Sequence, residues 1–259
     1  MALIIGHPWD ETLFGSSAVD SIDARGGNDV VRAGGGNVTV LGGEGNDVLN
    51  GAGGHDVLVG NTGSDTVSGG AGNDRMIWNN GDGSDRMEGG AGNDTTQVNG
   101  SDTDGDQFTI AANGARVDFD RVNLIPFSLD IGSTETLDVN GGGGNDTITG
   151  SNGLDGKIRL DLDGGAGWDV LKGGDGDDRL TGGVGSDTFI FGRGVDTITD
   201  FQNGQDKIQF DGYAWLNDFG DLAGRIHDVG SDVVIDLGAN DLHLENVQPG
   251  WLDASDFIF

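Results

Sequence analysis

Cysteine is absent from the 259-residue sequence, and proline occurs only three times. The absence of cysteine excludes a disulfide framework, a thiolate metal site and a cysteine nucleophile. Basic residues are also scarce, with 13 Lys and Arg against 44 Asp and Glu, which gives a formal net charge of −31. Such a surface repels the phosphates of nucleic acids and of anionic membranes, so we expect no nucleic-acid partner and expect cations instead.

Long hydrophobic runs and common catalytic motifs are missing as well. No apolar stretch approaches the roughly 18 residues of a membrane span, and the start MALIIGHPWDETLFG lacks the features of a cleaved signal peptide. The motifs H-E-x-x-H, G-x-S-x-G, G-x-x-x-x-G-K-[ST] and G-x-G-x-x-G do not occur, and the four histidines are scattered at His7, His55, His227 and His243. We therefore expect no zinc protease, serine hydrolase or nucleotide-dependent enzyme.

Glycine, in contrast, is abundant, with 52 residues, and it recurs with a fixed period. Residues 42–77 read GGEGNDVLN, GAGGHDVLV, GNTGSDTVS and GGAGNDRMI, four consecutive units of nine residues. Each unit has an apolar residue at its eighth place and an aspartate at its sixth, namely Asp47, Asp56, Asp65 and Asp74. A fixed period of this kind predicts a repeat architecture.

The nine-residue phase extends in both directions. Further sixth-place aspartates of this first array are Asp20, Asp29, Asp85 and Asp94. A second array places aspartate at Asp146, Asp169, Asp178, Asp187 and Asp196. Two inserted residues, Trp78 and Asn79, displace the phase without ending it, and Val38 occupies one aspartate place. The stretch GHPWDETLF resembles one more copy around Asp10, one residue out of phase.

We divide the chain into four segments. Residues 1–106 form the first array, and residues 141–201 form the second. Between them, QFTI, ARVDF, FSLDI and ETLDV alternate apolar and polar residues, which predicts wider β rungs over 107–140. The repeat is lost in 202–259, where QDKIQF and DVVIDL predict strands, AWLNDFGDLAGRI allows a short helix, and the whole segment is expected to cap the last rung.

Each unit is expected to form a six-residue turn followed by a three-residue strand. Glycine permits positive φ angles and a close approach of backbones in the turn, and the eighth residue then points into a core. Two units complete one coil, so units eighteen residues apart lie above one another. The predicted fold is all-β, a parallel β-roll or β-helix solenoid with ions between the stacked turns.

Stacking brings the sixth-place carboxylates close together. At one strand spacing, about 4.8 Å, they repel unless a cation lies between them. Oxygen ligands in a flexible turn suit Ca²⁺ better than Mg²⁺, and the lack of cysteine or clustered histidine disfavours zinc and copper. The stacked pairs predicted to share an ion are 29/47, 47/65, 65/85, 56/74, 74/94, 146/169, 169/187 and 178/196.

These pairs predict about eight Ca²⁺ ions, which would reduce the charge of −31 to about −15. Val38 removes one carboxylate from the sites shared with Asp20 and Asp56, so we expect weak or absent binding there.

The units resemble those of the RTX (repeats-in-toxin, hemolysin-type) family, whose nonapeptide G-G-x-G-x-D-x-U-x is a known calcium-binding repeat that forms a β-roll. The resemblance implies that sixth-place carboxylates bind calcium together with backbone carbonyls of the turn. The implied carboxylates are Asp29, Asp47, Asp56, Asp65, Asp74, Asp85, Asp94, Asp146, Asp169, Asp178, Asp187 and Asp196. The implied carbonyls belong to Gly42, Glu44, Gly51, Gly53, Gly60, Thr62, Gly69 and Ala71.

The tail also resembles the C-terminal region of bacterial RTX proteins exported by the type I secretion apparatus. In those proteins an uncleaved signal ends in an acidic residue followed by apolar ones, and here Asp256 precedes Phe257, Ile258 and Phe259. The resemblance implies a secreted, extracellular or cell-surface protein. It would leave the cell as an unfolded chain and fold in the millimolar calcium outside.

The favoured function is a non-catalytic calcium-binding structural or surface module. An adhesin that binds a polysaccharide or a cell surface is an alternative, because Trp9, His55 and Trp168 stand in turns where an aromatic ring can contact sugar or cover a neighbouring loop. A polysaccharide-active enzyme is a further alternative. It would require a cleft that pairs Asp118 or Asp120 with Arg116 or Arg121.

One acidic stretch lies outside the repeat phase. Asp102, Asp104 and Asp106 resemble the start of an EF-hand loop, but Gln107 stands where that loop requires glycine and Asn113 where it requires glutamate. We therefore expect a solvated turn or an auxiliary ion site there.

Overall fold

The computed structural model describes residues 2–222 and 224–259, and β-strands dominate it. The chain divides into two compact units, Met1–Asn99 with Asn113–Asp138, and Gly100–Ala112 with Val139–Phe259. The boundaries fall directly after β11 (Thr95–Asn99), at the end of β12 (Gln107–Asn113) and inside β15 (Thr136–Asn140). The four-segment division made from the sequence stays a prediction.

The first unit contains two sheets. Their strand orders are β1-β3-β5-β7-β9-β11 and β2-β4-β6-β8-β10-β14-β13. The strands are β1 (Ala2–Ile5), β2 (Thr12–Phe14), β3 (Asp20–Asp23), β4 (Val30–Arg32), β5 (Thr39–Glu44), β6 (Val48–Gly53), β7 (Val57–Thr62), β8 (Thr66–Ala71), β9 (Arg75–Asn79), β10 (Arg86–Ala91), β11 (Thr95–Asn99), β13 (Arg116–Arg121) and β14 (Phe127–Gly132).

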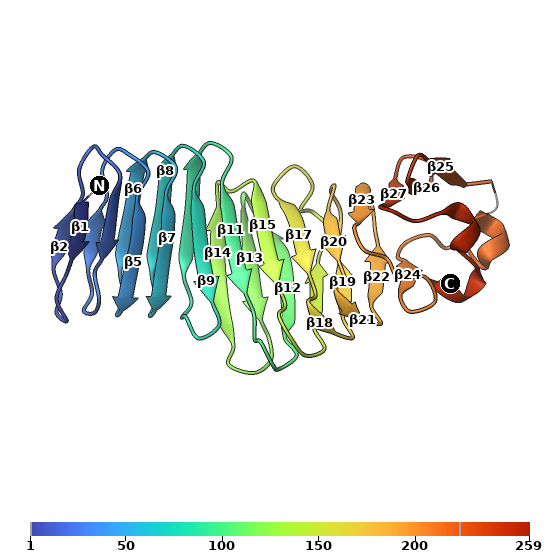
Figure 1. Cartoon of the computed structure of the whole chain (residues 1–259), viewed down its shortest axis with the longest axis horizontal. Helices are drawn as coiled ribbons and strands as arrows, with labels where there is room; N and C mark the ends of the chain where they lie inside the picture. Colours follow the sequence, from blue (N-terminus) through green and yellow to red (C-terminus); the bar gives the residue numbers. More distant parts are fainter. Residues whose placement is uncertain (1, 223) are drawn as a thin grey trace. The chain divides into compact units, whose positions relative to one another are not determined.

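Successive nonapeptides alternate between these two sheets. Each nonapeptide pairs in parallel with the second one after it, as Figure 1 shows for β5 and β7 and for β6 and β8. Val40 pairs with Leu58 and Leu49 pairs with Val67, so the register advances by eighteen residues. The eighth-place side chains, Leu49 and Leu58 among them, are fully buried. The predicted parallel β-solenoid is thereby confirmed.

The turns need glycine because their backbones stack in contact. Gly43 and Gly45 have φ angles of 108° and 122°, in the left-handed region that side chains rarely adopt. A Cβ on Gly43 would collide with the carbonyl oxygen of Arg25, and one on Gly45 with that of Gly27. The rung spacing, set by backbone hydrogen bonds, leaves no room for a larger residue at these two places.

The insertion Trp78–Asn79 lengthens one rung and gives it a large core residue. Trp78 is fully buried, its indole N–H donates to the Gly83 carbonyl at 2.7 Å, and its ring stacks on Phe127 with 3.7 Å between centroids. The guanidinium of Arg121 lies over both rings. After the insertion, Met76 pairs with Thr96, so the register step becomes twenty residues.

The glycine-poor segment contains an element that the alternating pattern does not predict. β13 and β14 pair in antiparallel fashion, with Phe119 opposite Leu129, and β14 continues the sheet by pairing in parallel with β10. The 113–138 hairpin formed by these strands therefore replaces a simple parallel rung. Its inward side chains, including Phe119 and Leu129, are buried.

The second unit repeats the two-sheet plan, with strand orders β17-β20-β23-β27-β26-β25 and β12-β16-β19-β22-β24-β28, and adds a small sheet of two strands, β18-β21. Its strands after β12 are β16 (Thr147–Gly150), β17 (Arg159–Asp163), β18 (Ala166–Gly167), β19 (Val170–Lys172), β20 (Arg179–Thr181), β21 (Val184–Gly185), β22 (Thr188–Phe191), β23 (Val195–Ile198), β24 (Lys207–Phe210), β25 (Ile226–Val229), β26 (Asp232–Asp236), β27 (Asp241–Leu244) and β28 (Phe257–Ile258). Short 3-10 turns are η1 (Phe219–Leu222), η2 (Pro249–Trp251) and η3 (Ala254–Asp256).

The last segment covers the end of this second solenoid. β24 and β26 are the two strands predicted from QDKIQF and DVVIDL, and η1 is a short turn of helix within the stretch that allowed one. β25, β26 and β27 form an antiparallel meander, and Phe257 stacks on Phe210. Among the described residues, none of the helical segments is long and apolar enough to cross a membrane.

Candidate metal centre

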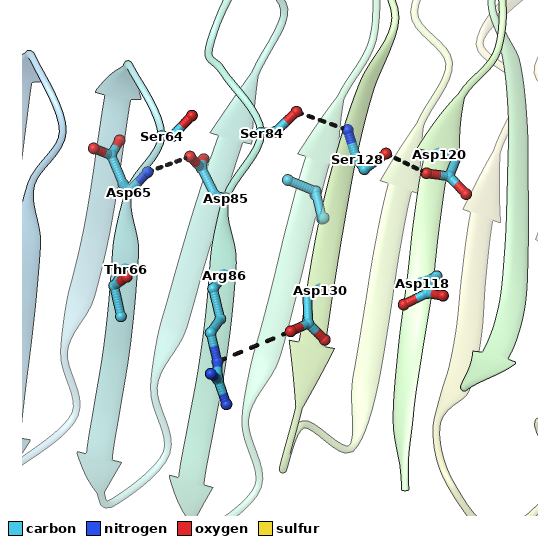
Figure 2. A pocket seen from close by; sticks show the side chains of 11 residues that line it. Ser64, Asp65, Thr66, Ser84, Asp85, Arg86, Asp118, Asp120, Ser128 and Asp130 are labelled. Atoms are coloured by element: carbon cyan, nitrogen blue, oxygen red, sulfur yellow. Dashed lines mark hydrogen bonds and ion pairs between the residues drawn. The ribbon is translucent and has the colours of Figure 1, made fainter. Parts of the chain in front are cut away.

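The sixth-place aspartates form a ladder along each stack. One carboxylate oxygen, Oδ1, accepts a hydrogen bond from the backbone N–H of the sixth-place residue one rung earlier. Asp47 accepts from Asp29 at 2.8 Å, and Figure 2 shows Asp85 accepting from Asp65, also at 2.8 Å. All eight predicted pairs are stacked by this bond: 29/47, 47/65, 65/85, 56/74, 74/94, 146/169, 169/187 and 178/196.

The other oxygen, Oδ2, is buried without a hydrogen-bond partner in most of these residues. Within the described part of the chain, this orphaned oxygen occurs in Asp29, Asp47, Asp56, Asp65, Asp74, Asp94, Asp146, Asp169, Asp178, Asp187 and Asp196. In nine of these residues it faces the first glycine of its own unit, whereas the units of Asp29 and Asp196 have Ala24 and Phe191 at that place. A Cβ built on Gly42 would lie 2.6 Å from the Gly60 carbonyl oxygen and closer still to Asp47 Oδ2. The missing side chain at the first place thus leaves a small cradle lined by oxygen.

A buried carboxylate without a partner is costly, because it loses its hydration and gains nothing in return. Burial raises the pKa of Asp65 to about 7, of Asp178 to about 7 and of Asp196 to about 8. A proton neutralises such a group, and so does a cation in the cradle.

The donor set suits calcium. Among the described residues, no group of three or more His, Cys, Asp or Glu side chains is placed to hold a metal. The oxygens around each cradle are instead carboxylates from the ladder and backbone carbonyls such as those of Gly60 and Gly69. Calcium accepts about six to eight oxygen ligands, including carbonyls and water, in a flexible geometry. The residues present therefore fit Ca²⁺.

A family model of the RTX calcium-binding nonapeptide repeat matches residues 10–40, 41–76, 80–95, 138–155 and 163–198, more than half of the chain. The chain belongs to this RTX repeat family. The resemblance seen in the repeat is confirmed, and the RTX protein is therefore a structural module built from calcium-binding repeats.

No curated protein matches the RTX chain significantly. Among solved structures, it is similar to the extracellular lipase LipA from Serratia marcescens, with 16% identity and a TM-score of 0.31. The match covers 99% of this chain and 39% of the lipase chain, so the chain spans well under half of that protein's length.

Some carboxylates in the RTX ladder have no orphaned oxygen. Asp20 Oδ2 accepts from the backbone N–H and the hydroxyl of Ser16, Asp106 Oδ2 accepts from Ser101 N–H, and Asp206 Oδ2 accepts from Gln202 N–H. In these residues a backbone N–H of the protein binds the Oδ2 atom that a cation would otherwise bind. We call these the internally bonded carboxylates.

Two of the internally bonded carboxylates were not recognised in the sequence. Asp106 is fully buried, and its N–H donates to Asp146 Oδ1 at 2.6 Å, so the expectation of a solvated turn is wrong for this residue. Asp102 and Asp104 are exposed, as that expectation requires. Asp206 lies beyond the recognisable repeat, although Asp187 N–H donates to it as in the ladder.

The first copy is in phase rather than one residue out of phase. Glu11 occupies the sixth place, since its N–H donates to Asp29 Oδ1 at 2.8 Å. Its carboxylate is bonded to the backbone and ring of His7. Asp10 stands at the fifth place, where it accepts from Asn28 N–H. Glutamate in an aspartate place concealed the phase.

Fifth-place side chains form a second, outer ladder that the sequence analysis missed. Asn28 accepts from Asn46 N–H, and Asn46 accepts from Ser64 N–H, both at 2.8 Å. His55 takes the same part through Nδ1, which accepts from Asn73 N–H at 2.8 Å. The preference for Asn, Asp, Ser or His at this place was the available signal. Trp168, another fifth-place residue, leaves its ring 69% exposed.

Val38 is buried in a rung that has lost its sixth-place carboxylate. Its N–H still donates to Asp56 Oδ1 at 2.8 Å, so the rung stacks normally. The first place of this unit is Ala33, which is fully buried, in place of glycine. The apolar side chain of Val38 thus replaces the carboxylate, whereas a first-place alanine also occurs as Ala24 in the unit of Asp29, which keeps its orphaned oxygen. Weak or absent cation binding at this rung stays a prediction.

The residues whose backbone carbonyls were expected to bind calcium fall into two groups. The first-place residues Gly42, Gly51, Gly60 and Gly69 are buried beside the orphaned oxygens. The third-place residues Glu44, Gly53, Thr62 and Ala71 lie toward the outside of the turn. Carbonyls of the latter three accept backbone N–H groups from the preceding rung at 2.6–2.9 Å. The carbonyl oxygens of Gly60 and Gly69 line the cradles beside Gly42 and Gly51, respectively.

An open groove of about 480 Å³ crosses the outside of β8, β10, β14 and β13 (Figure 2). Asp118 and Asp120 line it together with Arg86, Asp130 and several serines. The arginines named for a catalytic pairing have other partners. Arg116 bonds Glu88 and Asp130, and Arg121 donates to the Ile125 carbonyl and to Asn80. These contacts give the enzyme interpretation no support.

Proposed function

We propose that this RTX protein is a secreted, non-catalytic module whose β-roll folds when about eight calcium ions enter the stacked turns. The observation that carries the proposal is the row of buried, orphaned Oδ2 atoms along each ladder. Calcium supplies the positive charge that these oxygens lack. Folding and binding are then one process, because the cradle exists only when two rungs are stacked.

The proposed sites are the eight stacked pairs. In each, the Oδ2 atom of the earlier aspartate and the first-place carbonyls of the two rungs face the ion, with other turn carbonyls or water completing the shell. The twelve aspartates named from the sequence remain the proposed carboxylate ligands. Eight divalent ions would offset about half of the net charge of −31.

Circular dichroism with calcium and then with excess chelator tests the proposal. We expect a large gain of β-structure on adding calcium and its loss with chelator, while magnesium at the same concentration has little effect. Sedimentation on the same samples should show an expanded chain becoming compact. A spectrum and a sedimentation rate that ignore calcium would refute calcium-dependent folding.

Export by a type I apparatus to the cell exterior is part of the proposal. It is supported by the RTX repeats and by the tail, in which Asp256 precedes three apolar residues. In a bacterial host carrying a type I transporter, the full chain should reach the medium. Removing residues 257–259 should retain it inside the cell, whereas export of the truncated chain would exclude this signal.

A polysaccharide-binding function is a second candidate, favoured by the groove of Figure 2. Its walls offer hydroxyl groups from Ser64, Ser84 and Ser128 beside carboxylates, a donor and acceptor mixture that suits sugar hydroxyls. A glycan array on calcium-loaded protein, repeated with Ser84→Trp to fill the groove, tests it. Binding that survives the filled groove would place any glycan contact elsewhere.

A further inference from the structure

Three orphaned oxygens remain after the eight pairs are assigned. They belong to Asp94, Asp187 and Asp196, the last sixth-place aspartates of their series. The rung after Asp187 presents Asp206, which is one of the internally bonded carboxylates and whose Oδ1 accepts from the Asp187 N–H. The rung after Asp94 is instead the end of the 113–138 hairpin, and it presents the carboxylate of Glu135.

Glu135 performs the ladder function of an aspartate. Its Oε2 accepts from the backbone N–H of Asp94 at 2.8 Å, the same bond that Asp94 Oδ1 accepts from Asp74 N–H at 2.8 Å. The turn here is shorter, because Ser133 aligns with Gly89 while Glu135 follows only two residues later. Glutamate has one methylene more than aspartate, which compensates for the missing turn residues.

The cradle beside Asp94 is preserved. Asp94 is 1% exposed, and a Cβ built on Gly89 would lie 2.8 Å from its Oδ2 and closer still to the Ser133 carbonyl oxygen. Ser133 holds a left-handed φ of 49°, unusual for a residue with a side chain. The orphaned oxygen, the adjacent first-place carbonyl and the stacked carboxylate are therefore all present.

Electrostatics agrees with this geometry. Burial, together with the negative charges of Asp74 and Glu135, raises the pKa of Asp94. Glu135 itself is exposed, so this cradle opens to solvent more than those between two complete nonapeptides. A cation here would exchange more readily and would be bound with water in place of the missing turn carbonyls.

We infer that Asp94, Glu135 and the Ser133 carbonyl form an additional calcium site at the end of the first array, which fastens the 113–138 hairpin to the last nonapeptide of that array. The inference rests on the proposed function, since it assumes that orphaned ladder oxygens bind calcium. It adds a site in which the second carboxylate comes from a residue that no repeat motif includes.

Native mass spectrometry of the intact chain with calcium, combined with hydrogen exchange at residues 133–137, tests the site. Glu135→Gln keeps an acceptor for the Asp94 N–H but removes the charge. We expect it to bind one calcium ion fewer than the unaltered chain, with at least a tenfold loss of calcium-dependent protection at 133–137. Glu135→Asp keeps the charge but shortens the reach, and should lose the same ion.

Asp23→Asn is the matched control, because it removes one carboxylate from the outside of β3 in the same unit. It should bind as many ions as the unaltered chain. If Glu135→Gln retains every ion and the full protection, Glu135 is only a hydrogen-bond acceptor and the inference is wrong. If the unaltered chain binds no calcium at all, the proposed function fails first, and the inference fails with it.

Discussion

Most ladder aspartates are in one of two situations, and the second carboxylate oxygen distinguishes them. In Asp65 that oxygen is buried and orphaned, while in Asp20 it accepts from Ser16. Hydrogen bonds lower the pKa of Asp20, whereas burial raises that of Asp65 to about 7. A carboxylate already satisfied by the protein has little to gain from a cation, but an orphaned one has much.

This distinction gives a prediction at the residue scale. Asp65→Asn should lower the number of bound calcium ions by at least one, because its amide cannot supply a second anionic oxygen. Asp20→Asn should leave the number unchanged, although it weakens the hydrogen bonds that Ser16 donates to this side chain. Equilibrium dialysis with radioactive calcium measures both. Equal losses in the two variants would mean that orphaning does not mark the sites.

Two glycines of one unit allow a second test of the cradle. A Cβ on Gly51 would lie 2.6 Å from the Gly69 carbonyl and closer to Asp56 Oδ2, whereas one on Gly53 would meet nothing within 4 Å. Gly51→Ala should therefore weaken calcium binding at the 56/74 site by tenfold or more, measured by calorimetric titration. Gly53→Ala should bind like the unaltered chain. A Gly51→Ala protein with unchanged affinity would show that the ion does not use this space.

The sequence predicts the regular ladder residues well and the irregular ones poorly. The eight pairs could be found because aspartate recurs at a fixed place in each nonapeptide and because two nonapeptides make one turn of the solenoid. Glu11 and Glu135 could not, because a longer side chain fills the aspartate position and, at Glu135, a shorter turn breaks the count. Asp106 was missed because an EF-hand comparison considers the neighbouring residues, whereas its ladder partner Asp146 is forty residues away.

At the scale of the element, the nine-residue period and the apolar eighth place of the nonapeptide together define one rung of the solenoid. The nonapeptide specifies a strand, a turn and a register, since only one phase buries the eighth residue and places glycine where backbones touch. The 113–138 hairpin was not predictable in this way. Alternating apolar residues indicate a strand with one buried face, but they carry no information on whether its neighbour is parallel or antiparallel.

The inserted Trp78 shows how one element tolerates two extra residues. It is fully buried against Phe127 and Arg121, so Trp78→Ala should cost about 3–5 kcal/mol of unfolding free energy through the cavity it leaves. Urea unfolding in saturating calcium measures this cost. Trp9→Ala, at a ring 59% exposed in the same unit, should cost less than about 1 kcal/mol. Similar costs for both would mean that Trp78 does not support the lengthened rung.

At the scale of the whole molecule, protons and calcium compete for the same oxygens. In the metal-free fold, burial raises the pKa of several ladder aspartates, to about 6 for Asp47, about 7 for Asp146 and about 8 for Asp196. An unfolded aspartate titrates near 3.9. The native state then binds more protons than the unfolded state between about pH 4 and pH 8, so the metal-free fold loses stability as pH rises through that window.

Calcium should reverse this dependence, because it replaces the protons and its binding releases them. We expect β-structure in excess chelator to be greatest near pH 5 and to fall toward pH 8.5, while the calcium concentration needed for folding decreases over the same range. Addition of calcium to a weakly buffered solution at pH 6.5 should acidify it. Circular dichroism and a pH electrode suffice for these measurements, and magnesium serves as the control. A metal-free fold that gains β-structure toward pH 8.5 would contradict the prediction, since orphaned carboxylates without a proton or a cation would then have to be stable while charged.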